Sequence, residues 1–293
     1  MQPLISIVIA NYNYGRFLET ALQSVLRQCD EALRLPTGDM VEMIIVDGGS
    51  VDNSIEVIKK YSDKLTWWCS EKDRGQSDAF NKGFSKARGR FLTWLNADDI
   101  LLPNAIAHLK QGVEKYPSCE WFVGGCFWLN CELQVLKCSR ARPFSFYKAK
   151  QNEIPVWAPS SFFTKTLLDR VGGVDINFHY GMDTELWNRF WKFGNVFYRP
   201  IPVYCWGLRI HPDAKMSGHQ FPGSEHAKLT HPKWRQIQKE GNFFKERYGV
   251  PSHPKWFSRW LGLSFQFLIA SRYDTWRFKG RYYLDCVTKK EFV

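Results

Sequence analysis

Four short clusters of amide and carboxylate side chains have the residue types that bind a metal ion and a nucleotide. They are Asn11-Tyr12-Asn13, Asp47-Gly48-Gly49-Ser50, Asn96-Ala97-Asp98-Asp99 and Tyr180-Gly181-Met182-Asp183. Each cluster alone is typical of a turn or of a helix cap. Several carboxylates at one edge of a sheet, however, repel one another unless a cation or ligand lies between them. Their joint occurrence therefore favours a metal-nucleotide site.

The elements that must position these clusters alternate along the first part of the chain. Apolar runs that predict buried strands lie at 4–10, 43–46, 65–69 and 91–95. Helical patterns follow them, after residue 13, after a cap at Asp52, at 77–88 and from Pro103. This alternation predicts an α/β fold with a mostly parallel central sheet flanked by helices. Such sheets bind ligands at the carboxyl ends of their strands, where three of the clusters fall.

The pattern after residue 115 is less regular. Residues 120–136 are rich in strand-forming residues and predict a hairpin with Gly124-Gly125. Helices are predicted at 164–171, which ends at Gly172-Gly173, and at 183–193. Beyond about residue 215 the order of His, Pro, Lys and Trp is irregular, and aromatic-basic helical segments follow. We therefore expect a boundary near this point.

Composition and charge narrow the class of protein. The 293 residues are 44% hydrophobic and 24% charged, which excludes a disordered or collagen-like chain. The formal net charge is +11, and residues 233–293 carry 13 basic and 5 acidic side chains, a net charge of +8. A basic tail attracts the phosphates of nucleic acid, of anionic lipid or of a diphosphate-linked substrate.

Cysteine spacing and hydropathy predict the compartment. The eight cysteines form no CxxC pair, and the chain opens without a leader-like apolar run. The apolar stretch at 261–270 is much shorter than the roughly 20 residues that span a bilayer. We therefore expect reduced thiols in a cytoplasmic protein.

Several segments, in order, resemble family-2 glycosyltransferases with the GT-A fold. They are ISIVIANYNYGRFLETALQSVLRQ, EMIIVDGGSVDNS, SEKDRGQSDAFNKGFSKARGRFLTWLNADD, then GGVDINFHYGMDTELWNRF and Arg209-Ile210-His211. The resemblance implies inverting transfer of a sugar from a nucleoside diphosphate, with a UDP-sugar favoured, to an acceptor hydroxyl. It also implies help from a divalent metal. Because it fades after about residue 220, we expect a catalytic domain over 1–220 and a helical extension over 221–293.

Carried over by position, the resemblance assigns the nucleotide site. It implies that Ala10, Asn11 and Asn13 line the uridine and that Asp47 hydrogen-bonds the uracil ring. Amide and carboxylate groups suit this position because an unpaired polar group of the base would cost about 1–3 kcal/mol in a cleft.

A second part of the nucleotide site comes from residues 72–78. They match a family loop that lies over the base and the donor, and they include Arg74 and Asp78. Asp78 also suits the first turn of the following helix, where the helix dipole favours a carboxylate.

The metal site is assigned in the same way. Asn96 stands at the first position of the family's usual Asp-x-Asp motif, and the resemblance implies that it meets the ribose or the donor sugar. Asp98 is then a ligand of Mg²⁺ or Mn²⁺, an ion that takes further oxygens from the diphosphate. His211 would complete the metal site. Asp99 is either a second ligand or the cap of the next helix.

Two groups complete the assigned chemistry. Arg209, with Lys215, would face the diphosphate. Asp183 stands where the family places its catalytic base, and an inverting displacement needs such a carboxylate to take the proton of the acceptor hydroxyl. Two alternatives are that Asp183 only caps its helix and that Glu185 is the base.

The basic extension allows two interpretations. Aromatic and basic residues alternate at 256–260, 272–273 and 276–279. They predict either an interfacial helix on an anionic membrane or a helix that packs on the catalytic domain. The first interpretation suits a saccharide or lipid-linked acceptor in surface polysaccharide or glycoconjugate synthesis, with peripheral contact to the inner membrane surface through 250–293.

Two rival functions remain open. A nucleic-acid-binding α/β protein would explain the tail, but the chain has no recognised nucleic-acid motif, so we expect no nucleic-acid partner. A non-catalytic sugar-nucleotide-binding homologue would explain Asn96. Trp128 and Trp157 suit either sugar stacking or core packing.

Overall fold

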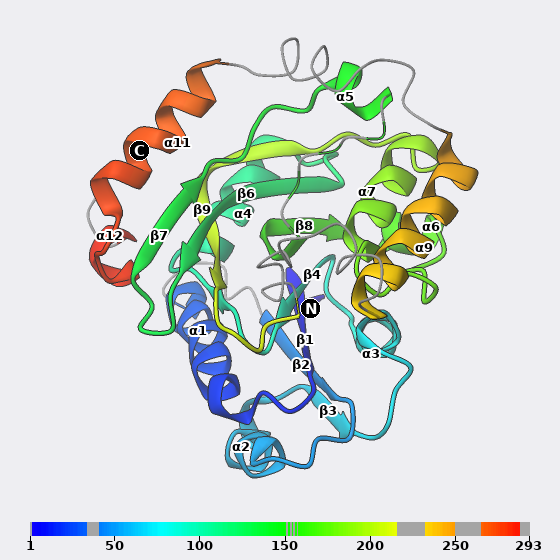
Figure 1. Cartoon of the computed structure of the whole chain (residues 1–293). Coiled ribbons are helices and arrows are strands. Elements are labelled where there is room, and N and C mark those ends of the chain that lie inside the picture. The colour runs from blue at the N-terminus through cyan, green and yellow to red at the C-terminus, as the bar shows by residue number, and fades with distance from the viewer. Residues whose placement is uncertain are drawn as a thin grey trace.

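A computed structural model of the protein describes residues 2–33, 41–215 apart from 151, 153, 155 and 157, 232–249 and 265–287. Its centre is one nine-stranded sheet with the strand order β3-β2-β1-β4-β8-β6-β9-β5, in which β7 also pairs with β6 (Figure 1). The strands are β1 Ile5–Asn11, β2 Val41–Asp47, β3 Trp67–Ser70, β4 Phe91–Asn96, β5 Ile100–Leu101, β6 Trp121–Leu129, β7 Val135–Ser139, β8 Ser161–Thr164 and β9 Arg199–Arg209.

Helices cover both faces of this sheet. Along the first two thirds of the chain they are α1 Gly15–Leu33, α2 Ser54–Lys60, α3 Gln76–Lys86, α4 Ala105–Lys115, α5 Phe146–Lys150, α6 Lys165–Arg170 and α7 Met182–Lys192. Side chains of α1, α2 and α4 share one hydrophobic core with Ile7 and Ile45. Those of α3, α6 and α7 share the other core with Val8 and Ile44. Because successive strand residues point to opposite faces, the apolar runs of β1 and β2 feed both cores.

The predicted parallel sheet is confirmed for the strands of the first hundred residues. β2 pairs in parallel with β1 and β3, and β1 pairs in parallel with β4. The second part of the sheet is mixed, because β8 runs antiparallel to β4 and β6 whereas β6 and β9 are parallel.

The predicted hairpin exists, but its turn lies elsewhere. β6 and β7 are antiparallel, and the turn lies at 130–134. Gly124 and Gly125 lie within β6, where its register with β9 shifts. A Cβ on Gly124 would lie 2.3 Å from Cys205 Sγ, so the glycines are needed for close approach to β9 rather than for a turn.

Helix starts differ slightly from prediction. Asn53 is the cap residue of α2, while the Asp52 carboxylate accepts the N–H of Ser54 at 3.0 Å. α4 begins two residues after Pro103, at Ala105. The predicted helices at 164–171 and 183–193 are confirmed as α6 and α7.

The C-terminal helices pack directly on the rest of the molecule. They are α9 Pro232–Tyr248, α11 Phe265–Phe278 and α12 Tyr283–Val287. In Figure 1, α11 and α12 lie beside β7, while α9 lies beside α7 on the opposite side. Phe278 and Tyr283 are buried in a core with Phe127, and Asp274 pairs with Arg140 at 2.6 Å.

The packing interpretation of the tail therefore holds for the inner faces of these helices. The outer face of α11 exposes Tyr273 by 54% and Trp276 by 79%. The predicted segment at 256–260 lies outside the described residues. Among the helices that the structure describes, none is long and apolar enough to cross a membrane. The seven cysteines with described side chains are all free thiols.

Candidate active site

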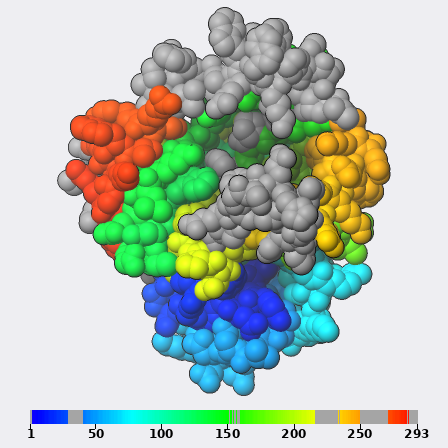
Figure 2. All heavy atoms as spheres, in the orientation of Figure 1, coloured from blue at the N-terminus to red at the C-terminus, as the bar shows by residue number. Residues whose placement is uncertain are grey.

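The carboxyl ends of β1, β2 and β4 meet at one edge of the sheet and bring three predicted clusters together. Asn11 is the ladder partner of Asp47, and Ala10 is the partner of Asn96. The chain after β9 returns to the same edge. Figure 2 shows this yellow segment, up to residue 215, lying against the blue N-terminal residues. The site is therefore built from both ends of the predicted catalytic domain.

Asp47 is fully buried, and both of its carboxylate oxygens accept hydrogen bonds from neighbouring side chains and backbone amides. Its Oδ1 accepts from Asn11 Nδ2 at 2.6 Å and from the Ser50 hydroxyl at 2.5 Å. Its Oδ2 accepts the N–H groups of Gly49 and Ser50 and the Ser70 hydroxyl. Burial acts to raise the pKa of Asp47, but these bonds hold it below its ordinary value. A uracil ring could bond to Asp47 only by replacing one of these donors.

Asn11, Tyr12, Gly48 and Asp73 lie next to Asp47, and we call them the base cradle. Asn11 Oδ1 is buried and has no hydrogen-bond partner among the described residues. Tyr12 is 62% exposed and was not predicted as a binding residue. A Cβ on Gly48 would lie 2.8 Å from Asp73 Oδ2 and 3.3 Å from the Tyr12 ring, so glycine lets these two side chains approach the backbone closely. Asn13 Oδ1, by contrast, accepts a backbone N–H of the loop after β2.

The side chains of Asp98 and His211 are in direct contact. His211 Nε2 lies 3.1 Å from Asp98 Oδ2, and both residues are buried. The rings of Phe17 and Tyr14 lie 4.4 and 5.6 Å from the imidazole ring and fix its position. The described residues include no group of three or more His, Cys, Asp or Glu that could hold an ion alone. One carboxylate and one imidazole fit Mg²⁺ or Mn²⁺ when substrate oxygens supply the other ligands.

Asp99 connects two strands that carry residues of the site. Its carboxylate accepts the backbone N–H of Arg209 at 3.0 Å and the Asn96 amide at 2.8 Å, so it ties the end of β4 to β9. Burial, and then the adjacent charge of Asp98, raise the pKa of Asp99 well above its ordinary value. These bonds favour a supporting role over metal ligation.

Arg209 is a buried cation with unused donors. Only 4% of the residue is exposed, and its Nε and Nη2 have no hydrogen-bond partner in the part of the chain that the structure describes. The guanidinium lies 4.8 Å from the Phe17 ring centre. Burial lowers the pKa of Arg209 below its ordinary value. Such a group is costly to bury, and an anionic ligand would offset that cost.

A chain of hydrogen bonds links the motif at the end of β4 to the segment after β9. Gln76 Nε2 donates to Asn96 Oδ1 at 2.7 Å, and Lys215 Nζ donates to Gln76 Oε1 at 2.8 Å. Lys215 Nζ also donates to the carbonyl of His179. Burial lowers the pKa of Lys215 to about 8. The Asn96 side chain therefore accepts from Gln76 through its carbonyl oxygen and donates to Asp99 through its amide NH₂ group.

Arg74 and Asp78 pair with each other rather than with the cluster at the strand ends. Arg74 Nη2 lies 2.7 Å from Asp78 Oδ1, and the Arg74 side chain is 71% exposed. Asp78 Oδ2 also accepts the backbone N–H of Arg74 at 3.2 Å. The observed contacts of Asp78 are thus those of a carboxylate in the first turn of α3.

Asp183 lies in the first turn of α7. Its Oδ1 accepts the N–H of Thr184 at 2.7 Å. Burial raises the pKa of Asp183 above its ordinary value, although Thr184 and the charge of Lys215 act in the opposite direction. A carboxylate in such surroundings is suited to accept a proton.

Glu185 is committed to other contacts. Its side chain is fully buried and pairs with Arg189 at 2.7 Å. It also accepts from Arg247 Nη1 at 2.7 Å and from the Tyr248 hydroxyl at 2.6 Å. These bonds join α7 to α9 and leave Asp183 as the carboxylate at the start of α7 that is suited to the base role.

One further contributor had no sequence signal. Glu240 of α9 accepts the N–H groups of His179, Tyr180 and Gly181, just before α7. A single glutamate about sixty positions from its partners leaves no spacing to recognise. Of the two tryptophans considered for sugar stacking, Trp128 packs against the core of α1 and α4, and Trp157 lies outside the described residues.

Comparison with known families gives one match that spans just over half of the chain. The family model described as Glycosyl transferase family 2 matches residues 6–159. An uncharacterized glycosyltransferase of Rickettsia prowazekii is 25% identical over 205 residues, which cover 67% of this chain and 61% of that protein. Another, from Nostoc, is 37% identical over 110 residues, which cover 36% of this chain and 32% of that protein. The chain thus spans about three fifths and one third of these two relatives.

Solved structures with the same fold support the architecture. S. aureus TarS in complex with UDP-GlcNAc has a TM-score of 0.56 and 13% sequence identity, over 94% of this chain and 83% of that chain. Mannosyltransferase PcManGT from Pyrobaculum calidifontis, in complex with GDP-Man and Mn²⁺, has a TM-score of 0.51 and 19% identity, over 73% and 59%. At these identities the likeness shows the fold alone. The fold is that of GT-A glycosyltransferases.

Proposed function

The chain belongs to glycosyltransferase family 2, and we propose that it transfers a sugar from a UDP-sugar to an acceptor hydroxyl by a single inverting displacement that needs Mg²⁺ or Mn²⁺. The observation that carries this proposal is the convergence at one sheet edge of the base cradle, the Asp98–His211 pair and the buried Arg209. A nucleoside diphosphate and one divalent ion together satisfy all three.

Each residue has a distinct task in the proposed reaction. Asp98 and His211 would hold the ion, which neutralises the charge that develops on the leaving diphosphate. Arg209 and Lys215 would meet the diphosphate oxygens, because buried cations gain most from an anionic partner. Asp183 would take the proton of the acceptor hydroxyl as the new bond to the anomeric carbon forms.

The donor base is proposed from the chemistry of the cradle and from the fold neighbours. TarS is seen with UDP and with UDP-GlcNAc, whereas PcManGT is seen with GDP-Man. Asn11 offers an amide acceptor, and Tyr12 offers an exposed ring for stacking. We favour a UDP-sugar because the buried Asn11 Oδ1 can accept the N–H of a uracil ring and because the TarS structures hold UDP or UDP-GlcNAc.

A thermal-shift panel tests this choice on the full chain. UDP, GDP, CDP and dTDP are each added with and without Mn²⁺, and the melting temperature is recorded. We expect the largest rise for UDP with Mn²⁺, because a ligand that binds only the native state stabilises it. No rise with any nucleotide would contradict the enzyme proposal, and a larger rise with GDP would move the donor to a GDP-sugar.

The two rival functions give different results in the same panel. A non-catalytic homologue would bind UDP and Mn²⁺ but release no UDP from UDP-sugars in the presence of saccharide acceptors. Asn96 keeps this rival open, since it replaces a carboxylate at the first position of the motif. A nucleic-acid-binding protein would bind RNA tightly and with strong salt dependence, without a nucleotide shift.

The acceptor and the location are proposed from the extension. We infer a saccharide or lipid-linked acceptor and a cytoplasmic enzyme that contacts the inner membrane surface through 250–293. Tyr273 and Trp276 on the outer face of α11, with Arg272 beside them, have the character of an interfacial surface.

A further inference from the structure

Glu240 is a buried carboxylate outside the residues discussed for catalysis. It lies in the middle of α9 and is only 5% exposed. Its Oε1 accepts the N–H of His179 at 2.9 Å, and its Oε2 accepts the N–H groups of Tyr180 at 2.9 Å and Gly181 at 3.0 Å. Gln236 Nε2, one turn earlier in α9, donates to Oε1 at 2.9 Å. One carboxylate thus binds three consecutive backbone amides.

These amides lie immediately before the proposed base. α7 begins at Met182, and the Glu185 N–H makes the first helical bond to the Gly181 carbonyl. Gly181 is the cap residue of α7, and because a cap N–H has no partner within the helix, the Glu240 carboxylate satisfies it and the helix dipole. Glu240 thus binds the three residues that lead into α7, whose second residue is Asp183.

The same loop also contacts Lys215, the lysine after β9 that we propose meets the diphosphate. The His179 carbonyl accepts from Lys215 Nζ, and the Phe178 carbonyl accepts from the Ser77 hydroxyl at 2.7 Å. The carbonyl groups of Phe178 and His179 are thus bound by α3 and by the segment after β9, while the N–H groups of residues 179–181 are bound by Glu240 of α9. Glu240 therefore holds the amide side of these three residues.

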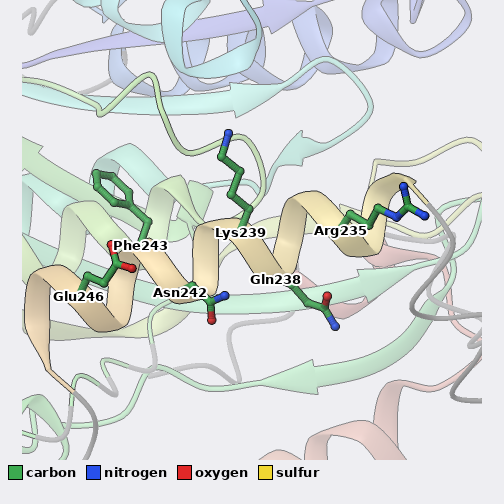
Figure 3. Close-up of a pocket in the computed structure, with 6 residues that line it drawn as sticks. All are labelled: Arg235, Gln238, Lys239, Asn242, Phe243 and Glu246. Carbon is green, nitrogen blue, oxygen red and sulfur yellow. The ribbon is translucent and has the colours of Figure 1, made fainter.

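α9 is itself firmly seated, so its carboxylate is a rigid anchor. The rings of Phe243 and Phe178 are 5.5 Å apart. Arg247 lies 2.7 Å from Asp175 and 2.7 Å from Glu185. Another face of α9 lines an open hollow of about 450 Å³, where Figure 3 shows Glu246 among the lining side chains. Glu246 therefore offers a matched residue on the same helix, away from the loop.

We propose that Glu240 is a positioning residue for sugar transfer: by binding the amides of residues 179–181 it fixes the start of α7 and holds Asp183 at the acceptor. The inference rests on the proposed function. It makes α9, from the extension after residue 220, a part of the catalytic unit. The physical basis is that charge-assisted bonds are about twice as strong as neutral ones, and that a small misplacement of a reacting group costs much of the rate.

Glu240→Gln in the full chain tests this role, because glutamine keeps the size but turns an NH₂ group toward the loop amides. We expect kcat for transfer to fall by about 10- to 100-fold. Because Glu240 also favours the charged form of Lys215, UDP binding is measured well below pH 8, where Lys215 stays protonated. The Kd for UDP with Mn²⁺ should then stay within about twofold. Glu240→Asp keeps the charge and should recover part of kcat. Glu246→Gln should match the wild type in every measurement.

Three results separate the possibilities. Wild-type kcat in Glu240→Gln would overturn the inference. A parallel fall of kcat, UDP affinity and melting temperature would also overturn it, because Glu240 would then act only on folding. Wild-type protein that transfers no sugar would contradict the proposed function instead. In that case amide hydrogen exchange at 178–182 still tests the role of Glu240. We expect faster exchange in Glu240→Gln, and unchanged exchange would show that Glu240 does not hold the loop.

Discussion

At the scale of single residues, Arg209 is the residue whose replacement should change UDP affinity most without lowering the stability of the protein. Its guanidinium is buried beside Phe17, and two of its nitrogens have no hydrogen-bond partner in the described structure. Arg209→Met should therefore change the melting temperature little, because removing a costly buried charge is set against losing its attraction to Asp99 and Asp98. UDP affinity should fall by roughly 10- to 100-fold, since a bond to a charged group contributes about 1.5–3 kcal/mol. A large fall in melting temperature with unchanged UDP affinity would show a structural role.

Asp183 and Glu185 are predicted to fail in different ways. Asp183→Asn keeps the side-chain size but cannot take a proton, so turnover should fall by at least about 100-fold while UDP affinity changes little. Glu185→Gln instead breaks a buried ion pair with Arg189 and should cost about 3–5 kcal/mol of stability. Steady-state kinetics and denaturant unfolding of both variants check this. Near-normal turnover in Asp183→Asn would exclude it as the base.

The pH dependence of UDP binding should report Lys215. Because burial lowers its pKa to about 8, the ammonium is charged below that pH and neutral above it. Asp183 and Glu240 face this ammonium and favour its charged form, whereas Lys233 disfavours it. UDP affinity should therefore fall as the pH rises from 8 to 9, and Lys215→Arg should remove this fall because arginine stays charged. Titration calorimetry at several pH values measures it. The same fall in Lys215→Arg would point to another group.

At the scale of elements, glycine positions show where helices meet the sheet. A Cβ on Gly83 of α3 would lie 2.3 Å from Val8 Cγ1, so Gly83→Ala should cost about 1–3 kcal/mol by overpacking. Gly241 of α9 has no atom within 4 Å of such a Cβ, so Gly241→Ala should be neutral or stabilising by up to about 1 kcal/mol. Thermal unfolding of the two variants provides the comparison. Equal stability would mean that α3 can shift away from β1.

Helices and strands could be predicted from the sequence where the local residue pattern determines them. Contacts between residues far apart in the chain could not. The apolar runs that form β1, β2 and β4, and the polar residues after them, predicted that Asn11, Asp47 and Asn96 would share one edge. The hairpin at 120–136 was predicted, but the role of Gly124 within its first strand was not, because its close partner, Cys205, is eighty residues away. Glu240 was not predicted for the same reason. Sequence patterns report neighbours along the chain, whereas these two residues act through neighbours in space.

At the scale of the whole molecule, the C-terminal helices have both a packed and an exposed face. Asp274 pairs with Arg140, and Phe278 is buried against Phe127, so removing α11 would expose apolar surface and leave Arg140 without this partner. A chain that ends near residue 250 would therefore test packing as much as membrane contact. Substitutions on the exposed face of α11 test the membrane contact alone.

We predict that the full chain co-sediments with vesicles that contain anionic lipid and is released by high salt. Each basic residue near such a surface contributes about 1 kcal/mol before screening, and the exposed aromatic rings add to this. Replacing both Tyr273 and Trp276 with Ser should weaken the co-sedimentation by about tenfold without changing UDP affinity. Phe193→Ser, at the exposed residue that follows α7, is the control. Equal sedimentation of the double variant would remove α11 from the membrane surface.

The measurement that tests the central claim most directly is titration calorimetry of the full chain with UDP, in Mn²⁺ and in a chelator. The account predicts that UDP binds in Mn²⁺, that the chelator abolishes this binding, that Asp98→Ala abolishes it and that His211→Ala weakens it. Asp183→Asn should bind UDP as the wild type does, because its carboxylate serves the acceptor. UDP binding that is independent of Mn²⁺ and unchanged in both Asp98→Ala and His211→Ala would contradict the proposed metal-nucleotide site.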